Sequence, residues 1–212
     1  MAIVTDFGCN VQAYADGFER LHFPRPKVCL HCQVVDMFIG HGYYLRKPLD
    51  QHRSYLIRIK RWYCKNCHRT LSLLPSFVLR FRHYLLAVIQ QVVVARFEVQ
   101  ASWSQVLARC TRLQAPSERT IKRWCHAFAE HAPCWLAAVE QTLAKQDATL
   151  PLLNALGEAT EPRDTACALL QAATQLLAWA KTRWTEVVPY GLNDRLRFLW
   201  HWGHARGLQR LI

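Results

Sequence analysis

Two Cys-x-x-Cys pairs constrain this 212-residue chain more than any other feature of its sequence. Cys29 and Cys32 stand in VCLHC, and Cys64 and Cys67 stand in YCKNC, with 31 residues between the pairs. Each pair can form a tight turn that directs two thiolates at one ion, and two such turns complete a tetrahedral shell of four sulfurs. The pattern predicts one structural zinc ion, because a closed shell of four thiolates leaves no ligand position for catalysis.

Redox and disulfide roles for these cysteines are the competing interpretations. The N-terminus MAIVTDFGCN lacks the basic and apolar regions of a secretion signal, so nine cysteines indicate a reducing, cytoplasmic compartment. Redox-active pairs ordinarily precede a helix, whereas strand-like segments flank both pairs here. We also expect no membrane partner, because no apolar run reaches ~18 residues.

The segment between the pairs reads as a β-hairpin. Residues 42–47 (GYYLRK) and 54–62 (SYLIRIKRW) resemble strands, and Ile57 and Ile59 alternate with Arg58 and Lys60 in the second one. The intervening KPLDQHR has turn chemistry, and residues 70–74 can add a third strand. A hairpin explains a gap longer than the usual ~15–20 residues, so residues 28–75 are predicted to form a zinc ribbon after an N-terminal segment, residues 1–27.

Residues 76–131 show the spacing of three helices. Apolar residues follow helical periodicity from Tyr84 to Phe97, Ser102 and Gln105 form a capping-box pattern, and Ser117 is placed to cap a third helix. The third helix is basic in its first turns, which is the arrangement of a helix-turn-helix recognition helix. The candidate DNA-contacting residues of this helix are Ser117, Arg119, Thr120, Lys122 and Arg123.

The net charge of +12 is localised in the middle of the chain. Residues 51–126 contain fourteen Lys or Arg and two Asp or Glu, whereas residues 1–50 and 127–212 are each neutral. A localised basic block is the expected footprint of a polyanionic partner. Five basic residues of the predicted ribbon are therefore candidate phosphate contacts: Arg58, Lys60, Arg61, Lys65 and Arg69.

The order of a Cys-x-x-Cys pair, a basic strand, RWYCKNCHRT and a helix-turn-helix pattern resembles the N-terminal DNA-binding region of bacterial insertion-sequence transposases and related free-standing mobile-element proteins. The resemblance covers about residues 28–128. It implies sequence-directed binding to double-stranded DNA in the nucleoid, with a role in transposition, recombination or transcription control. It also implies that Cys29, Cys32, Cys64 and Cys67 are the metal ligands and that the helix from Ser117 reads the DNA.

The C-terminal region, residues 132–212, departs from a transposase. It has three helical patterns, at 134–145, 165–181 and 192–202, and its acidic residues lie at helix surfaces, caps and loops. We therefore expect no catalytic domain and no enzyme activity. Five of the eight tryptophans lie here, which fits a helical core or a surface for self-association or a protein partner.

Together these patterns predict a mostly α protein with a small β zinc ribbon, a three-helix helix-turn-helix unit and a helical C-terminal extension. The predicted function is zinc-dependent, non-catalytic DNA binding. Two alternatives stay open: a zinc ribbon that docks an acidic protein, and a single-stranded RNA or DNA binder that uses the basic, aromatic hairpin with Tyr43, Tyr44, Trp62 and Tyr63.

Overall fold

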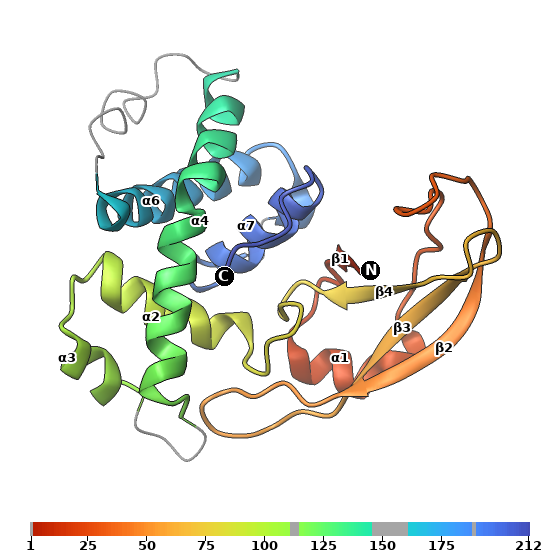
Figure 1. The fold of residues 1–212 in the computed structure, drawn as a ribbon, viewed down its shortest axis with the longest axis horizontal. Helices are drawn as coiled ribbons and strands as arrows, with labels where there is room; N and C mark the ends of the chain where they lie inside the picture. Colours follow the sequence, from red (N-terminus) through yellow and green to blue (C-terminus); the bar gives the residue numbers. More distant parts are fainter. Residues whose placement is uncertain (1, 111–114, 146–160, 188–189) are drawn as a thin grey trace. The chain divides into compact units, whose positions relative to one another are not determined.

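The computed structural model divides the chain into two compact units, Met1–Leu85 (unit 1) and Leu86–Ile212 (unit 2). It describes residues 2–110, 115–145, 161–187 and 190–212. Unit 1 contains a four-stranded sheet and unit 2 is helical, as Figure 1 shows. The expected mixture of helices with one small sheet is thereby confirmed.

The sheet of unit 1 has the strand order β1-β4-β3-β2. Strands β2 (Phe38–Arg46), β3 (Ile57–Cys64) and β4 (Thr70–Pro75) form an antiparallel meander. The predicted alternation in β3 is present, since Ile57 and Ile59 are fully buried while Arg58 and Lys60 are half-buried. β2 is an edge strand, and its pairing with β3 shifts register between Gly40 and Tyr43.

The N-terminal segment, for which no structure was predicted, completes the sheet. β1 (Ala2–Thr5) pairs in parallel with β4, and the Asn10 side chain caps α1 (Val11–Gly17) by accepting from the Ala13 N–H. The short 3-10 helix η1 (Phe18–Arg20) follows. Tyr14 of α1 is fully buried and donates its hydroxyl hydrogen to the Arg58 carbonyl at 2.9 Å. α1 is thus packed on the sheet, and residues 1–27 belong to the same unit as both cysteine pairs.

Unit 2 begins with α2 (Leu86–Phe97), which is buried along most of its length, and α3 (Trp103–Ala108). The predicted capping box is confirmed, because Ser102 accepts from the Gln105 N–H and the Gln105 side chain accepts from the Ser102 N–H. α2 starts two residues later than the periodicity indicated. Tyr84 and Leu85 instead make isolated bridges to Leu49 and Val78, so they close unit 1.

One helix, α4 (Glu118–Ala144), replaces the two helices expected on either side of residue 132. Pro133 lies inside it, and its missing N–H removes one helical hydrogen bond. The apolar stripe nevertheless continues without a phase change through Phe128, Ala132, Trp135 and Val139, all of which are buried. Burial of this continuous stripe offsets the local cost of the proline.

The remaining elements are α6 (Pro162–Lys181), η2 (Thr185–Val187), η3 (Leu192–Asp194) and α7 (Arg195–His204). The two later predicted C-terminal helices correspond to α6 and α7. α6 packs along α4. Arg195 of α7 pairs through its guanidinium with Glu98, the residue after α2, and donates to the Thr174 hydroxyl of α6. No helix among the described residues is long and apolar enough to cross a membrane.

Candidate metal centre and the basic residues around it

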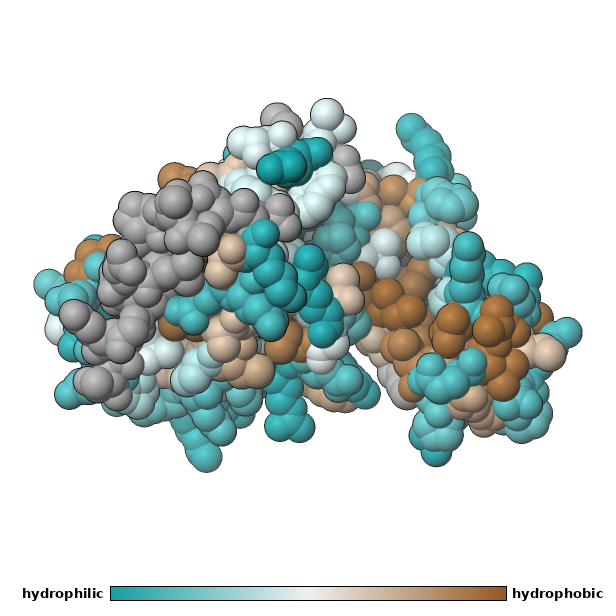
Figure 2. All heavy atoms as spheres, turned by 90° about the horizontal axis from the view of Figure 1, so that it is seen from above, coloured by the Kyte–Doolittle hydropathy of each residue, from teal (hydrophilic) through white to brown (hydrophobic). Residues whose placement is uncertain are grey.

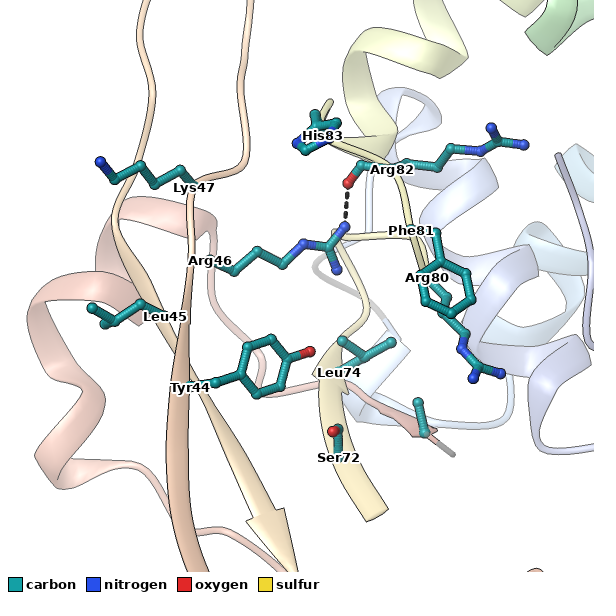
Figure 3. A pocket seen from close by; sticks show the side chains of 11 residues that line it. Tyr44, Leu45, Arg46, Lys47, Ser72, Leu74, Arg80, Phe81, Arg82 and His83 are labelled. Carbon is teal, nitrogen blue, oxygen red and sulfur yellow. Dashed lines mark hydrogen bonds between the residues drawn. The ribbon is translucent and has the colours of Figure 1, made fainter. Parts of the chain in front are cut away.

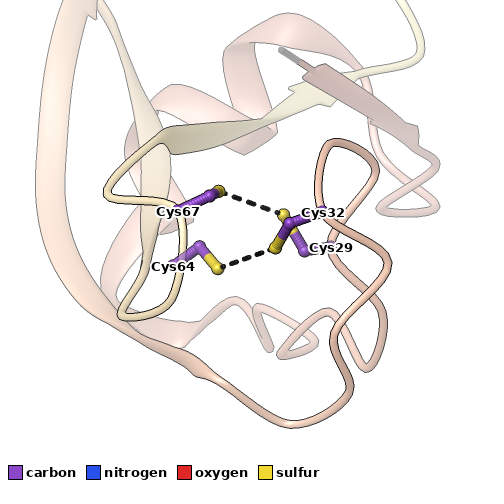
Figure 4. Close-up of side chains that lie close together, drawn as sticks. All are labelled: Cys29, Cys32, Cys64 and Cys67. Carbon is purple, nitrogen blue, oxygen red and sulfur yellow. Dashed lines mark hydrogen bonds between the residues drawn. The ribbon is translucent and has the colours of Figure 1, made fainter.

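The four predicted ligand cysteines meet at one point of unit 1, as Figure 4 shows. The Sγ atoms of Cys29 and Cys67 lie 3.7 Å apart, as do those of Cys32 and Cys64, and all four lie within 4.8 Å of one another. A disulfide needs about 2.05 Å, so these are free thiols. A regular tetrahedron with metal–sulfur bonds of about 2.3 Å places its sulfurs about 3.8 Å apart. The cluster therefore fits one tetrahedral ion.

The two cysteine turns have the same backbone hydrogen bonds, and we name them the first knuckle (residues 29–34) and the second knuckle (residues 64–69). In the first, the Cys29 N–H donates to Val34 O and the Gln33 N–H donates to Cys29 O, at 3.0 and 2.9 Å. In the second, the Cys64 N–H donates to Arg69 O and the His68 N–H donates to Cys64 O, both at 3.0 Å. Each sulfur pair is therefore placed by its own turn.

Gln33 and His68 occupy equivalent positions, one residue after the second cysteine of each knuckle, and both have φ of 58°. Side chains other than glycine are disfavoured there, because Cβ approaches the following carbonyl oxygen. The hydrogen-bonded turns hold both residues in this conformation. Local sequence patterns do not predict this conformation, because neither position carries the glycine that marks such a turn.

Electrostatics in the cluster favour a bound cation. Hydrogen bonds from the Asn66 side chain and the Val34 backbone lower the pKa of the Cys32 thiol to about 6, whereas burial raises the pKa of Cys67 to about 12. Neighbouring thiolates repel one another, so all four cannot ionise together without a compensating charge. A divalent metal ion supplies that charge, and four soft sulfur donors suit zinc or iron.

The cysteine cluster is part of the hydrophobic core of unit 1. Cys29 and Cys64 are 2% and 0% exposed, and they pack with Phe38, Leu71 and Leu73. Phe38 begins β2, while Leu71 and Leu73 belong to β4. The ion would therefore join the first knuckle to the ends of three strands, which is a structural role.

The five basic residues predicted in unit 1 have different surroundings. Arg58 is engaged within the unit, because it pairs with Glu19 and its guanidinium lies 4.2 Å from the Phe18 ring centroid. Lys60 and Arg61 are half-buried, and the Lys60 ammonium lies 5.4 Å from the centroid of the Trp62 ring. The other two, Lys65 and Arg69, are exposed and lie in the second knuckle itself.

The five residues predicted to contact DNA from unit 2 lie at the start of α4. Ser117 is the N-cap and accepts from the Thr120 N–H at 3.3 Å, and the two hydroxyls lie 2.9 Å apart. Arg119 and Arg123 are exposed one turn apart. Lys122 pairs with Glu118 at 2.6 Å, and its ammonium lies 5.7 Å from the Trp103 ring centroid. These contacts hold Lys122 against the helix surface.

Sequence reasoning missed two features beside these residues. The first is α1, whose signal is the helix-capping Asn10 before VQAYADG, together with η1, which supplies the Glu19 partner of Arg58. The second is a pocket on the sheet of unit 1, lined partly by residues 80–83. Arg80 and Arg82 belong to the basic block of residues 51–126, whereas Arg46 and Lys47 precede it, and only the folded chain brings the four together.

Residues 29–124 match the protein family described as a domain of unknown function (DUF6431). The matched segment includes all four clustered cysteines and ends within the first turns of α4. Neither the curated proteins nor the solved structures compared with the chain contain a significant match.

Proposed function

We propose that this chain is a non-catalytic DNA-binding protein whose sheet unit is a zinc ribbon stabilised by one zinc ion. Cys29, Cys32, Cys64 and Cys67 hold the ion, and the four sulfurs favour a d10 metal that accepts tetrahedral geometry. The ion supplies folding free energy and a fixed shape. The chain itself supplies the contacts to nucleic acid.

The observation that carries the proposal is the position of Lys65 and Arg69. Both are exposed, and both lie in the turn that presents Cys64 and Cys67. A bound ion would hold these cations in one arrangement, so less conformational entropy is lost when they contact phosphates. The +12 charge of residues 51–126 agrees with a polyanionic partner of this kind.

The start of α4 is the proposed source of sequence preference. Arg119 and Arg123 are exposed at a helical N-terminus, as a recognition helix requires, and Arg can bind the O6 and N7 atoms of guanine. The connection from α3 spans residues 109–117, which is longer than the usual three to four residues of a helix-turn-helix. The resemblance to insertion-sequence transposases supports a function at mobile-element or recombination sites.

The test combines metal analysis with DNA selection. We expect about one zinc ion per chain and enrichment of a common duplex sequence from a random pool at near-physiological salt. Replacing Lys65 and Arg69 with Ala should weaken all duplexes alike and reduce the salt slope of log K by about 2. Arg119→Ala should also change the preferred sequence.

Arg163→Ala is the matched control in unit 2, because Arg163 is an exposed arginine at the start of α6 and lies outside the basic block. It should leave binding unchanged. Enrichment of no sequence, together with no loss of affinity in the Lys65 and Arg69 variant, contradicts DNA binding through these residues.

Protein docking is the second candidate, and the exposed apolar side chains in and beside the first knuckle favour it. Val28, Leu30, Val35 and Met37 are each more than 40% exposed, and Ile39 of β2 adjoins them along the chain. Figure 2 shows hydrophobic atoms gathered at the right-hand end of the molecule. Exposed apolar patches mark interaction surfaces. This function would be identified by an acidic protein that displaces duplex DNA from the chain, if single-stranded nucleic acid does not displace it.

A further inference from the structure

A basic pocket lies in unit 1, away from the cysteine cluster. It has a volume of about 710 Å³, within the range of sites for small ligands. Four of its lining residues are Lys or Arg and none is acidic. Tyr44 and Arg46 point into the pocket from β2, and residues 80–83 form the opposite wall (Figure 3). This composition selects an anionic ligand with an aromatic part.

Arg46 fixes the wall of the pocket. Its guanidinium donates to Leu79 O at 2.6 Å and to Arg82 O, and the Arg82 N–H donates to Leu79 O at 3.3 Å. Residues 79–82 therefore form a turn that is held from β2. The wall is a defined surface, so it can present side chains without a large ordering cost on binding.

Phe81 is the residue that the fold itself does not explain. It occupies the third position of the turn with φ of 60°, where glycine is favoured and an aromatic residue is disfavoured. Its side chain is 81% exposed, and the Arg80 guanidinium lies 4.5 Å from its ring centroid. An exposed ring in a disfavoured backbone conformation, with a cation beside it, indicates a functional contact.

We propose that this pocket binds one unpaired nucleotide of a nucleic-acid strand. Phe81 stacks against the base, Arg80 pairs with the adjoining phosphate, and the hydroxyls of Tyr44 and Ser72 face the edge of the base. A paired base is already stacked on both sides, so an open ring beside a hollow suits a base that has left the helix. The inference rests on the proposed nucleic-acid binding and adds a preference for unpaired positions.

The experiment compares a short, fully paired duplex with the same duplex carrying one extra unpaired nucleotide, by fluorescence anisotropy on the full-length, metal-loaded protein. We expect roughly tenfold tighter binding of the second probe, from one base–aromatic stack. Phe81→Gly keeps the turn, because glycine suits this φ, and should bring the affinity ratio to about one. Phe81→Trp should keep the preference.

Leu56→Ala is the matched control, because Leu56 is 55% exposed in the same unit and does not line the pocket. It should behave as the wild type. Equal binding of both probes by the wild type, or a preference that survives Phe81→Gly, overturns the pocket and leaves duplex binding standing. Binding of neither probe overturns the proposed function as well.

Discussion

Removing the metal ion is expected to unfold unit 1 and to leave unit 2 folded. The chain divides into two compact units, and all four clustered cysteines belong to unit 1. The first knuckle contributes Cys29 and Cys32 to the cluster, and both pack with the small core around Phe38. Without the ion, this core must hold the knuckle alone.

The magnitude follows from the size of the unit. At roughly 0.05–0.15 kcal/mol per residue, the 85 residues of unit 1 have about 4–13 kcal/mol of stability. A structural zinc ion contributes about 10–16 kcal/mol of apparent binding free energy in small zinc domains. The loss on chelation is therefore as large as the whole stability of the unit, and the metal-free sheet should be unfolded.

Amide hydrogen exchange is the assay, because it reports both units in one sample. After chelation, the amides of β3 should lose protection while those of α6 keep it. Cys64→Ser should have the same effect without chelator. Cys134→Ser is the matched control, since Cys134 is an exposed free thiol in α4. Full protection of β3 in protein shown to be metal-free would refute the assignment of a structural ion.

Three further predictions test individual features of the fold. Gln33→Val should lower the stability of the metal-loaded protein in urea by about 1–2 kcal/mol, because a β-branched residue is strained at φ of 58°, whereas Gln33→Gly should not lower it. Gly203→Ala should lower the stability of unit 2 by about 1–3 kcal/mol, because the added Cβ would lie 2.1 Å from the Trp135 ring. The measurement is the loss of helical circular dichroism in urea. Gly191→Ala is the control, because the nearest atom to its added Cβ lies at 3.9 Å. Burial raises the pKa of the Tyr14 phenol, so unit 1 should lose stability as pH rises past about 10, where the phenol ionises in the unfolded chain. The urea midpoint of unfolding should fall over this pH range, and Tyr14→Phe should make the midpoint less dependent on pH.

The sequence by itself identified the four candidate metal ligands. A Cys-x-x-Cys turn brings its two sulfurs together through local backbone hydrogen bonds, so spacing alone identified Cys29, Cys32, Cys64 and Cys67. The alternation of Ile57 and Ile59 with charged residues likewise fixed which positions of β3 are buried, because a strand has period two. The turn within each cysteine pair and the alternation in β3 depend on neighbours along the chain, whereas the meeting of the two pairs is a long-range contact.

Only the tertiary structure decided which basic side chains have partners within the chain and which are exposed. Arg58 looked like Lys65 in the sequence, yet it pairs with Glu19 of η1, in a segment for which no structure was predicted. Lys122 looked like Arg119 and Arg123 in the sequence. In the folded chain it forms an ion pair with Glu118, and its ammonium lies over the Trp103 ring. The partners of Arg58 come from distant chain segments, which periodicity does not encode.

The continuity of α4 and the pocket beside β2 were decided in the same way. Pro133 argues for a helix end when the sequence is considered locally, and packing of the continuous apolar stripe overrides it. Arg46 and Phe81 are 35 positions apart, and only the folded sheet places that guanidinium against the turn that presents the ring. Short-range chemistry places the two sulfurs of each cysteine pair, whereas long-range packing determined which basic and aromatic side chains are available to a partner.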